Sequence, residues 1–224
     1  MATAARFGNG NGNGNGNGRA QVEFPPTLPG YEHINRYWDN TRNRTAAKIM
    51  PGQCYVTIRG ELITTVLGSC VSVCIRDAKL GIGGMNHFML PHSDDPHNWG
   101  GVSSAARYGS YAMETLINEV MKAGGTRRNF EIKAFGGGRI VNQMIDIGEQ
   151  NIRFLLDYLK LEGMRLLSHD LGDVYPRKIV YYPDSGKVQV KRLRKLHNLT
   201  ILERENQYQH TIEEKPVQGD IELF

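Results

Sequence analysis

Membrane-spanning segments, a disulfide framework and a strong net charge are all missing from this chain of 224 residues. No run of about 18 apolar residues occurs, which excludes a membrane-spanning helix. The N-terminus, MATAARFGNG, lacks the apolar core of a secretory signal. Cysteine occurs at three positions, an odd number that favours a reduced, cytoplasmic protein. Because the net charge is only +4, we expect no nucleic-acid partner, and because no long apolar run occurs we expect no insertion into a membrane.

The composition fits one soluble domain with an extension at each end, at 40% hydrophobic and 22% charged residues. Residues 8–18 alternate Gly and Asn, and with the proline-rich stretch that follows they predict a disordered arm over residues 1–30. Residues 201–224 hold six acidic and two basic side chains, a net −4 that leaves +8 for the preceding 200 residues. We interpret residues 31–200 as the working domain and 201–224 as an acidic tail for solubility or docking.

Strands dominate the predicted secondary structure of the domain. The β-rich segments are 54–60, 61–67, 71–77, 82–90, 130–135, 164–171, 178–183 and 187–193. Two helices are predicted over 104–124 and 149–162, each ended by glycine. The last two strands flank Asp184-Ser185-Gly186, which predicts a hairpin. This pattern favours an α+β domain of stacked layers, with mixed sheets and two principal helices.

Cys70 is the candidate nucleophile, because it follows Gly68-Ser69 at a transition between two predicted strands. Backbone N–H groups of Gly68 and Ser69 at such a turn can hold a developing oxyanion. A thiol needs a base at neutral pH, and His87 lies 17 residues downstream on the next predicted strand. The hydroxyl of Thr64, on the strand entering the turn, could orient the imidazole.

Each of these residues also has a purely structural interpretation. Cys70 could be a small buried hydrophobe, His87 a hydrogen-bonded core residue and Thr64 an ordinary strand residue. A zinc site is a further alternative, with donors at Cys70, Cys74, His87, His92 and His97. Against it, Cys-x3-Cys is not the usual thiolate spacing, and the last two histidines lie in a polar loop. Glycines 136–138 match no phosphate-binding motif, so we expect a tight turn or a loop beside the site.

The segments TTVLGSCVSVCIRD and GIGGMNHFMLP resemble the CheD family, the chemoreceptor glutamine deamidases of bacterial chemotaxis. The resemblance continues through KAFGGGRIV and LSHDLGDVYPRKIVYYPDSGKVQVKRL and covers roughly residues 31–196. It implies a layered α/β/β fold of the cysteine-hydrolase type. It also implies a triad of Cys70, His87 and Thr64.

The resemblance further implies an activity and its partners. Receptor glutamines would be hydrolysed to glutamate through a thioester, with release of ammonia and without a metal, nucleotide or organic cofactor. Some relatives also bind the CheC phosphatase, which is therefore a possible partner. The alternatives are a non-catalytic adaptor that binds receptors or CheC, and a redox or metal sensor that uses Cys70 and Cys74.

Overall fold

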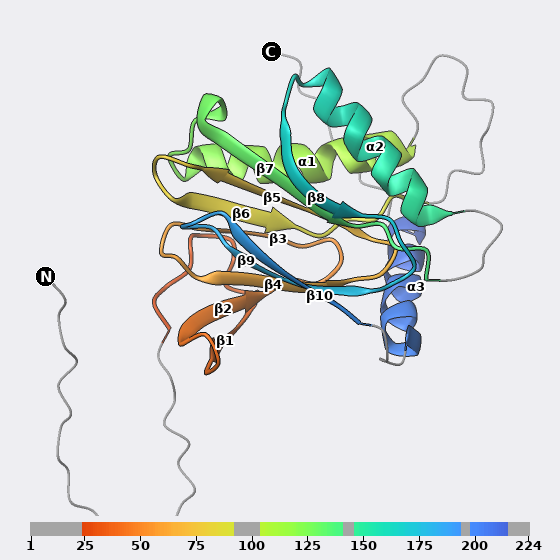
Figure 1. Ribbon diagram of the computed structural model, residues 1–224, viewed down its shortest axis with the longest axis horizontal. Coiled ribbons are helices and arrows are strands. Elements are labelled where there is room, and N and C mark those ends of the chain that lie inside the picture. Colours follow the sequence, from red (N-terminus) through yellow and green to blue (C-terminus); the bar gives the residue numbers. More distant parts are fainter. Residues whose placement is uncertain (1–23, 92–103, 141–145, 194–197, 215–224) are drawn as a thin grey trace, which may run out of the picture.

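The computed structural model describes residues 24–91, 104–140, 146–193 and 198–214 and has an α+β fold. Two five-stranded sheets face each other, and two helices cover the outer face of one of them (Figure 1). The layers therefore run helix, sheet, sheet. This confirms the expected layered architecture with mixed sheets.

The first sheet has the order β1-β2-β4-β9-β10. Its strands are β1 (Asn35–Asp39), β2 (Arg44–Lys48), β4 (Leu62–Leu67), β9 (Arg177–Tyr182) and β10 (Lys187–Arg192). β2 and β4 run parallel, and the other neighbours run antiparallel. Tyr182 pairs with Lys187, which confirms the predicted hairpin.

The second sheet has the order β3-β6-β5-β7-β8. Its strands are β3 (Cys54–Thr57), β5 (Val71–Asp77), β6 (Ile82–Asn86), β7 (Phe130–Gly136) and β8 (Leu166–Leu171). Only β7 and β8 among these neighbours run parallel. β6 ends at Asn86, four residues before the expected end at Leu90. The chain keeps both neighbours beyond this point, since His87 N–H donates to Gln53 and Phe88 pairs with Val71, but the Val73 N–H between them donates to the Asn86 side chain and interrupts the ladder.

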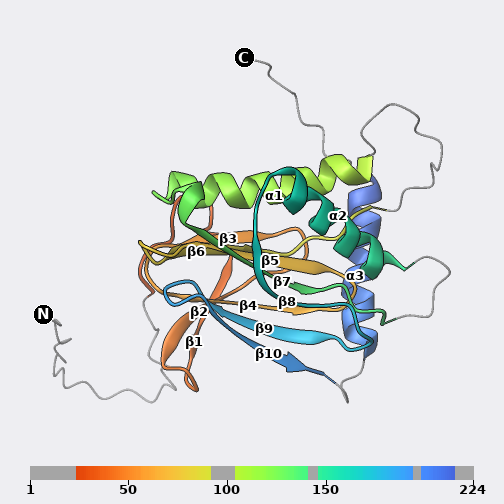
Figure 2. The ribbon, with the colours of Figure 1, turned by 45° about the horizontal axis from the view of Figure 1, so that its top comes forward.

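The two predicted helices are confirmed as α1 (Ser104–Lys122) and α2 (Ile147–Leu161), which lie on the second sheet (Figure 2). A short 3-10 helix, η1 (Arg127–Asn129), lies between α1 and β7. α2 begins at an N-cap, where the Asp146 carboxylate accepts the Glu149 N–H at 3.0 Å. The apolar residues of α1 at helical spacing are buried against the sheet, namely Met113, Leu116, Ile117 and Val120.

A third helix, α3 (Asn198–Glu214), occupies much of the segment that the charge pattern predicts to be an acidic tail. It stands across one end of both sheets, near the turns that connect their strands (Figures 1 and 2). Ile201 and Ile212 are buried on its inner side. This segment is an amphipathic helix, because its apolar residues recur at helical spacing. The excess of acidic residues between them conceals that pattern in the sequence.

Several sequence-based expectations concern residues that the structure does not describe. The Gly-Asn stretch, the loop with His92 and His97, and residues 215–224 all lie outside the described ranges. Among the described helices, none is long and apolar enough to cross a membrane.

Candidate active site

The turn of residues 68–70 links β4 in one sheet to β5 in the other, and hydrogen bonds to its carbonyl oxygens fix its backbone. Its three carbonyl oxygens accept hydrogen bonds from Gly138 N at 2.7 Å, the Asn151 amide at 2.9 Å and Gly137 N at 2.8 Å. Because each peptide group is planar and trans, fixing the oxygens of Gly68 and Ser69 also fixes the N–H groups that follow them. The glycine loop therefore lies beside this turn, as one of its two sequence interpretations predicts.

The N–H groups of the turn converge on one carboxylate, that of Glu205 in α3. Gly68 and Cys70 donate to Oε1 at 2.8 and 3.3 Å, and Ser69 donates to Oε2 at 2.9 Å. The Ser69 hydroxyl adds a fourth hydrogen bond at 2.7 Å. A Cβ on Gly68 would lie 2.8 Å from this carboxylate, so glycine permits the close approach. The turn is thus a preformed site for a negatively charged oxygen.

The imidazole of His87 is fixed by a threonine. Thr65 Oγ1 lies 2.8 Å from His87 Nδ1 and donates its single proton to the Ile49 carbonyl at 2.9 Å. The hydroxyl can therefore only accept from the ring, which places the ring proton on Nδ1 and leaves a lone pair on Nε2. Within the described part of the chain, Nε2 is buried and has no hydrogen-bond partner. This tautomer is the one that a general base requires.

Thr64, which the family resemblance implies as the third triad member, does not contact the ring. Its hydroxyl donates to the Ile179 carbonyl at 2.8 Å, in the strand pairing of β4 with β9. Successive residues of a strand point to opposite faces, so only one of the two threonines can face His87. The structure brings Thr65 to the imidazole and turns Thr64 away from it.

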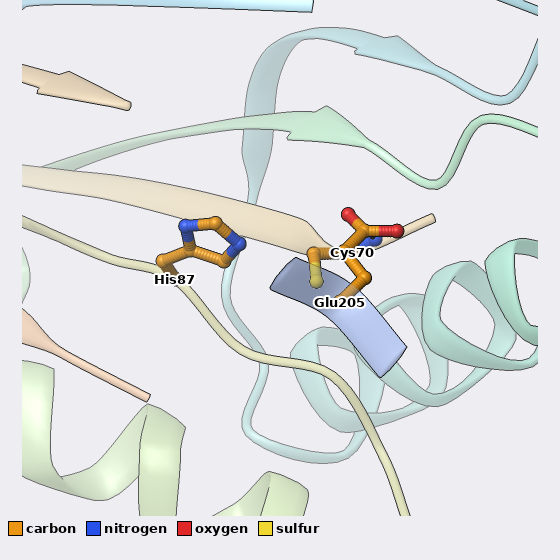
Figure 3. Close-up of side chains that lie close together, drawn as sticks. All are labelled: Cys70, His87 and Glu205. Carbon is orange, nitrogen blue, oxygen red and sulfur yellow. Dashed lines mark hydrogen bonds between the residues drawn. The ribbon is translucent and has the colours of Figure 1, made fainter. Parts of the chain in front are cut away.

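Cys70 and His87 meet at the end of the sheets, and Glu205 lies over them. A sulfur, a ring nitrogen and a carboxylate oxygen of these three residues lie within 4.8 Å of one another. Figure 3 shows the ring nitrogen remote from the His87 Cβ turned toward the Cys70 side chain. The three residues are 0%, 2% and 5% exposed in the order Cys70, His87, Glu205.

Burial and the nearby carboxylate set the protonation state of this pair. Burial raises the pKa of the Cys70 thiol well above its usual range, and the negative charge of Glu205 raises it further. Burial lowers the pKa of His87 to about 3. With α3 in place, the site therefore holds a neutral thiol beside a neutral imidazole.

The same three side chains are donors that zinc accepts, but their arrangement favours an anion. Both carboxylate oxygens of Glu205 already accept N–H groups, whose positive ends would oppose a cation. Cys74 does not join the cluster. It lies four residues along the extended strand, about 13 Å from Cys70, and pairs with Lys133. The two histidines of the zinc alternative at positions 92 and 97 fall outside the described residues.

Comparison with known proteins identifies the family of this chain. Residues 89–192 match the family model of CheD, described as chemotactic sensory transduction. A protein of Halorhodospira halophila is 52% identical over 206 residues, which cover 91% of this chain and 95% of that protein. A protein of Herminiimonas arsenicoxydans is 53% identical over 201 residues, covering 86% and 97%. Both relatives carry the name probable chemoreceptor glutamine deamidase CheD.

The chain belongs to the CheD family. Within this CheD-family chain, sequence reasoning missed three residues of the site: Thr65, Asn151 and Glu205. Asn151 is fully buried on α2, and a lone polar residue on the inner face of a helix could have indicated its role. Glu205 gives a similar signal, because it lies between Ile201 and Ile212 on the buried side of α3. Thr65 gives no signal of its own beside Thr64.

Proposed function

We propose that this protein hydrolyses the side-chain amide of glutamines on methyl-accepting chemotaxis receptors, giving glutamate and ammonia. One observation carries the proposal: Cys70 lies on a turn whose N–H groups converge on an anionic oxygen, beside an imidazole with a free Nε2. A nucleophile, a base and an oxyanion site are the parts that acyl transfer needs. The names of the relatives support the choice of receptor glutamines as substrate.

The first step is attack of Cys70 Sγ on the glutamine Cδ. His87 Nε2 accepts the thiol proton, and the oxygen that becomes negative is held by the N–H groups of Gly68, Ser69 and Cys70. The C–N bond then breaks, and His87 returns the proton to the leaving nitrogen, which departs as ammonia. A thioester joins the receptor side chain to the enzyme.

The second step is hydrolysis of that thioester. His87 Nε2 takes a proton from water, the hydroxide adds to the thioester carbon, and the C–S bond breaks as His87 returns the proton to sulfur, leaving glutamate and the Cys70 thiol. Thr65 acts here as a positioning residue, because it holds the His87 proton on Nδ1 and keeps Nε2 available. In this proposal Thr65 takes the orienting role that the family resemblance implies for Thr64.

The test is ammonia release from a glutamine-containing cytoplasmic receptor fragment. Cys70→Ala should abolish release, whereas Cys74→Ala is the matched control, because Cys74 is an equally buried cysteine outside the cluster. Both variants should keep the circular dichroism spectrum of the wild type. Full activity of Cys70→Ala would contradict the mechanism.

A non-catalytic adaptor predicts a different result from the same proteins. It would bind the receptor fragment without releasing ammonia, and Cys70→Ala would bind as the wild type does. Binding of the CheC phosphatase, which the resemblance implies for some relatives, remains a prediction. It is measured by titrating purified CheC into the full chain.

A further inference from the structure

α3 carries an acidic side chain in the centre of a mostly apolar buried face. Ile201, Glu205, Tyr208 and Ile212 follow at spacings of four, three and four residues, and so lie on one side of the helix. Ile201 and Ile212 are 6% and 7% exposed, and Glu205 between them is 5% exposed. Burying a carboxylate is unfavourable unless hydrogen bonds replace its hydration. The presence of Glu205 therefore has to be explained by what it contacts.

Its contacts are the donors of the active site. Within the described residues, Glu205 accepts hydrogen bonds from the turn 68–70, through three backbone N–H groups and the Ser69 hydroxyl. A glutamate side chain is also the group that deamidation of glutamine leaves behind. We propose that α3 is a built-in, product-like occupant of the active site, with Glu205 in the place of the product carboxylate. This inference rests on the proposed function, and it requires α3 to leave before a substrate glutamine enters.

The helix is seated at more than this one side chain. Two cavities border it: Ile201, Arg204 and His87 are among the residues that line one, and Leu202, Asn206 and Met89 are among those that line the other. Glu205 lines both cavities, so space remains on either side of the contact between α3 and the turn.

One turn further along, Tyr208 closes over the chain near the start of β3. A Cβ on Gly52 would lie 2.6 Å from the Tyr208 hydroxyl oxygen, so this close packing depends on glycine at position 52. The hydroxyl groups of Tyr208 and Tyr108 are in contact. Apolar and aromatic contacts on both sides of Glu205 thus hold α3 in register with the turn.

When α3 occupies the site, it inactivates Cys70 and His87 in two ways. It covers the turn that carries Cys70, whose side chain is fully buried, so no substrate can occupy the N–H groups of the turn. It also places a negative charge beside the thiol, which raises the pKa of Cys70 and suppresses the thiolate. Displacement of α3 would both expose the turn 68–70 and remove the negative charge beside the Cys70 thiol.

The sharpest test makes α3 a substrate of its own active site. In Glu205→Gln, the carboxamide oxygen keeps the position of Oε1 against the N–H groups of Gly68 and Cys70. Cys70 Sγ would bond to Cδ of the introduced glutamine, ammonia would leave with a proton from His87, and water would cleave the thioester. The product is Glu205, the wild-type sequence. Mass spectrometry of the purified full chain should show a gain of about one dalton, as expected for an amide converted to an acid.

Two controls make this result specific. Glu205→Gln combined with Cys70→Ala should keep the introduced amide at position 205. Glu203→Gln, on the exposed side of the same helix, should keep its amide even with Cys70 present. Persistence of the position-205 amide in a preparation that deamidates a receptor fragment would overturn the inference and leave the proposed function standing. If neither this amide nor the receptor glutamine reacts, the proposed function itself fails.

Alkylation tests the occupancy without relying on catalysis. Glu205→Ala removes the hydrogen bonds that hold α3 at the turn, so Cys70 should react with iodoacetamide at least about tenfold faster than in wild type. Glu203→Ala, which removes the same charge from the exposed side, should leave the rate unchanged. Cys74 serves as the internal control for unfolding and should stay unlabelled in both variants. Equal Cys70 rates in the two variants would show that Glu205 does not hold the site closed.

Discussion

Replacing each of two adjacent threonines by valine tests how His87 is oriented. Valine has nearly the shape of threonine but lacks the hydroxyl. In Thr65→Val, the His87 Nδ1–H loses its acceptor and the Ile49 carbonyl loses a donor, both in a buried site. In Thr64→Val, the Ile179 carbonyl alone loses a side-chain donor. Each variant therefore loses one side-chain hydrogen bond to a backbone carbonyl, and only Thr65→Val also loses the hydrogen bond to the imidazole.

The expected magnitudes follow from these contacts. An unsatisfied buried donor costs about 1–3 kcal/mol, and about 1.4 kcal/mol corresponds to a tenfold change in rate. If that energy goes into losing the reactive tautomer and ring orientation, kcat/KM of Thr65→Val falls by about 10- to 100-fold. For Thr64→Val we expect a loss of stability of about 1 kcal/mol and kcat/KM within about twofold of wild type.

The assay is steady-state ammonia release from a receptor fragment, with urea unfolding of the same proteins. Thr65→Ser should recover most of the activity, because it restores the hydroxyl, and should recover the pH profile of the wild type. A purely structural role for Thr65 predicts that activity follows stability in all three variants. The reasoning is refuted if Thr64→Val loses more activity than Thr65→Val.

Three further outcomes are expected. Burial lowers the pKa of His87 to about 3, whereas an unfolded histidine titrates near 6.5, so the unfolded chain binds an extra proton between these pH values. The free energy of unfolding should therefore be about 2 kcal/mol lower at pH 5 than at pH 8. Urea unfolding of His87→Gln should lack this component, and equal pH sensitivity of the variant and the wild type would contradict the expectation. In Asn151→Leu, kcat should fall by about tenfold, with a smaller rise in KM, because the Ser69 carbonyl loses its hydrogen bond and the Cys70 N–H is no longer held toward the oxyanion. Unchanged kcat in a folded variant would argue against this role. EDTA should leave ammonia release unchanged, and a loss that zinc restores would revive the metal site at Cys70, His87 and Glu205.

The elements that the sequence predicts best are those for which hydrophobic periodicity or turn residues favour a single structure. The β9–β10 hairpin follows from Asp184-Ser185-Gly186 between two alternating strands, and α1 and α2 follow from their apolar stripes. The meeting of Cys70 and His87 was predictable in outline, because a turn and a neighbouring strand bring them together. These elements depend on local patterns that tertiary packing leaves in place.

Two features of the site could not be predicted, for separate physical reasons. β4 is buried on both faces, with Thr64 and Thr65 at 3% and 2% exposure, so no alternation indicates which threonine faces the imidazole. α3 was hidden by its acidic residues, and its polar buried residue is explained only by N–H groups more than 130 positions earlier in the chain. The local sequence can therefore mark Glu205 as an acid on an apolar helix face, but it cannot identify the turn 68–70 as its partner.

The central claim is that Cys70 converts receptor glutamines to glutamates. Its most direct test is the mass of receptor peptides after co-expression of a receptor with the wild-type chain or with Cys70→Ala. Wild type should add about one dalton to each peptide that contains a substrate glutamine, and Cys70→Ala should add none. Deamidation of the same glutamines by Cys70→Ala, in cells that have no other deamidase, would contradict the account.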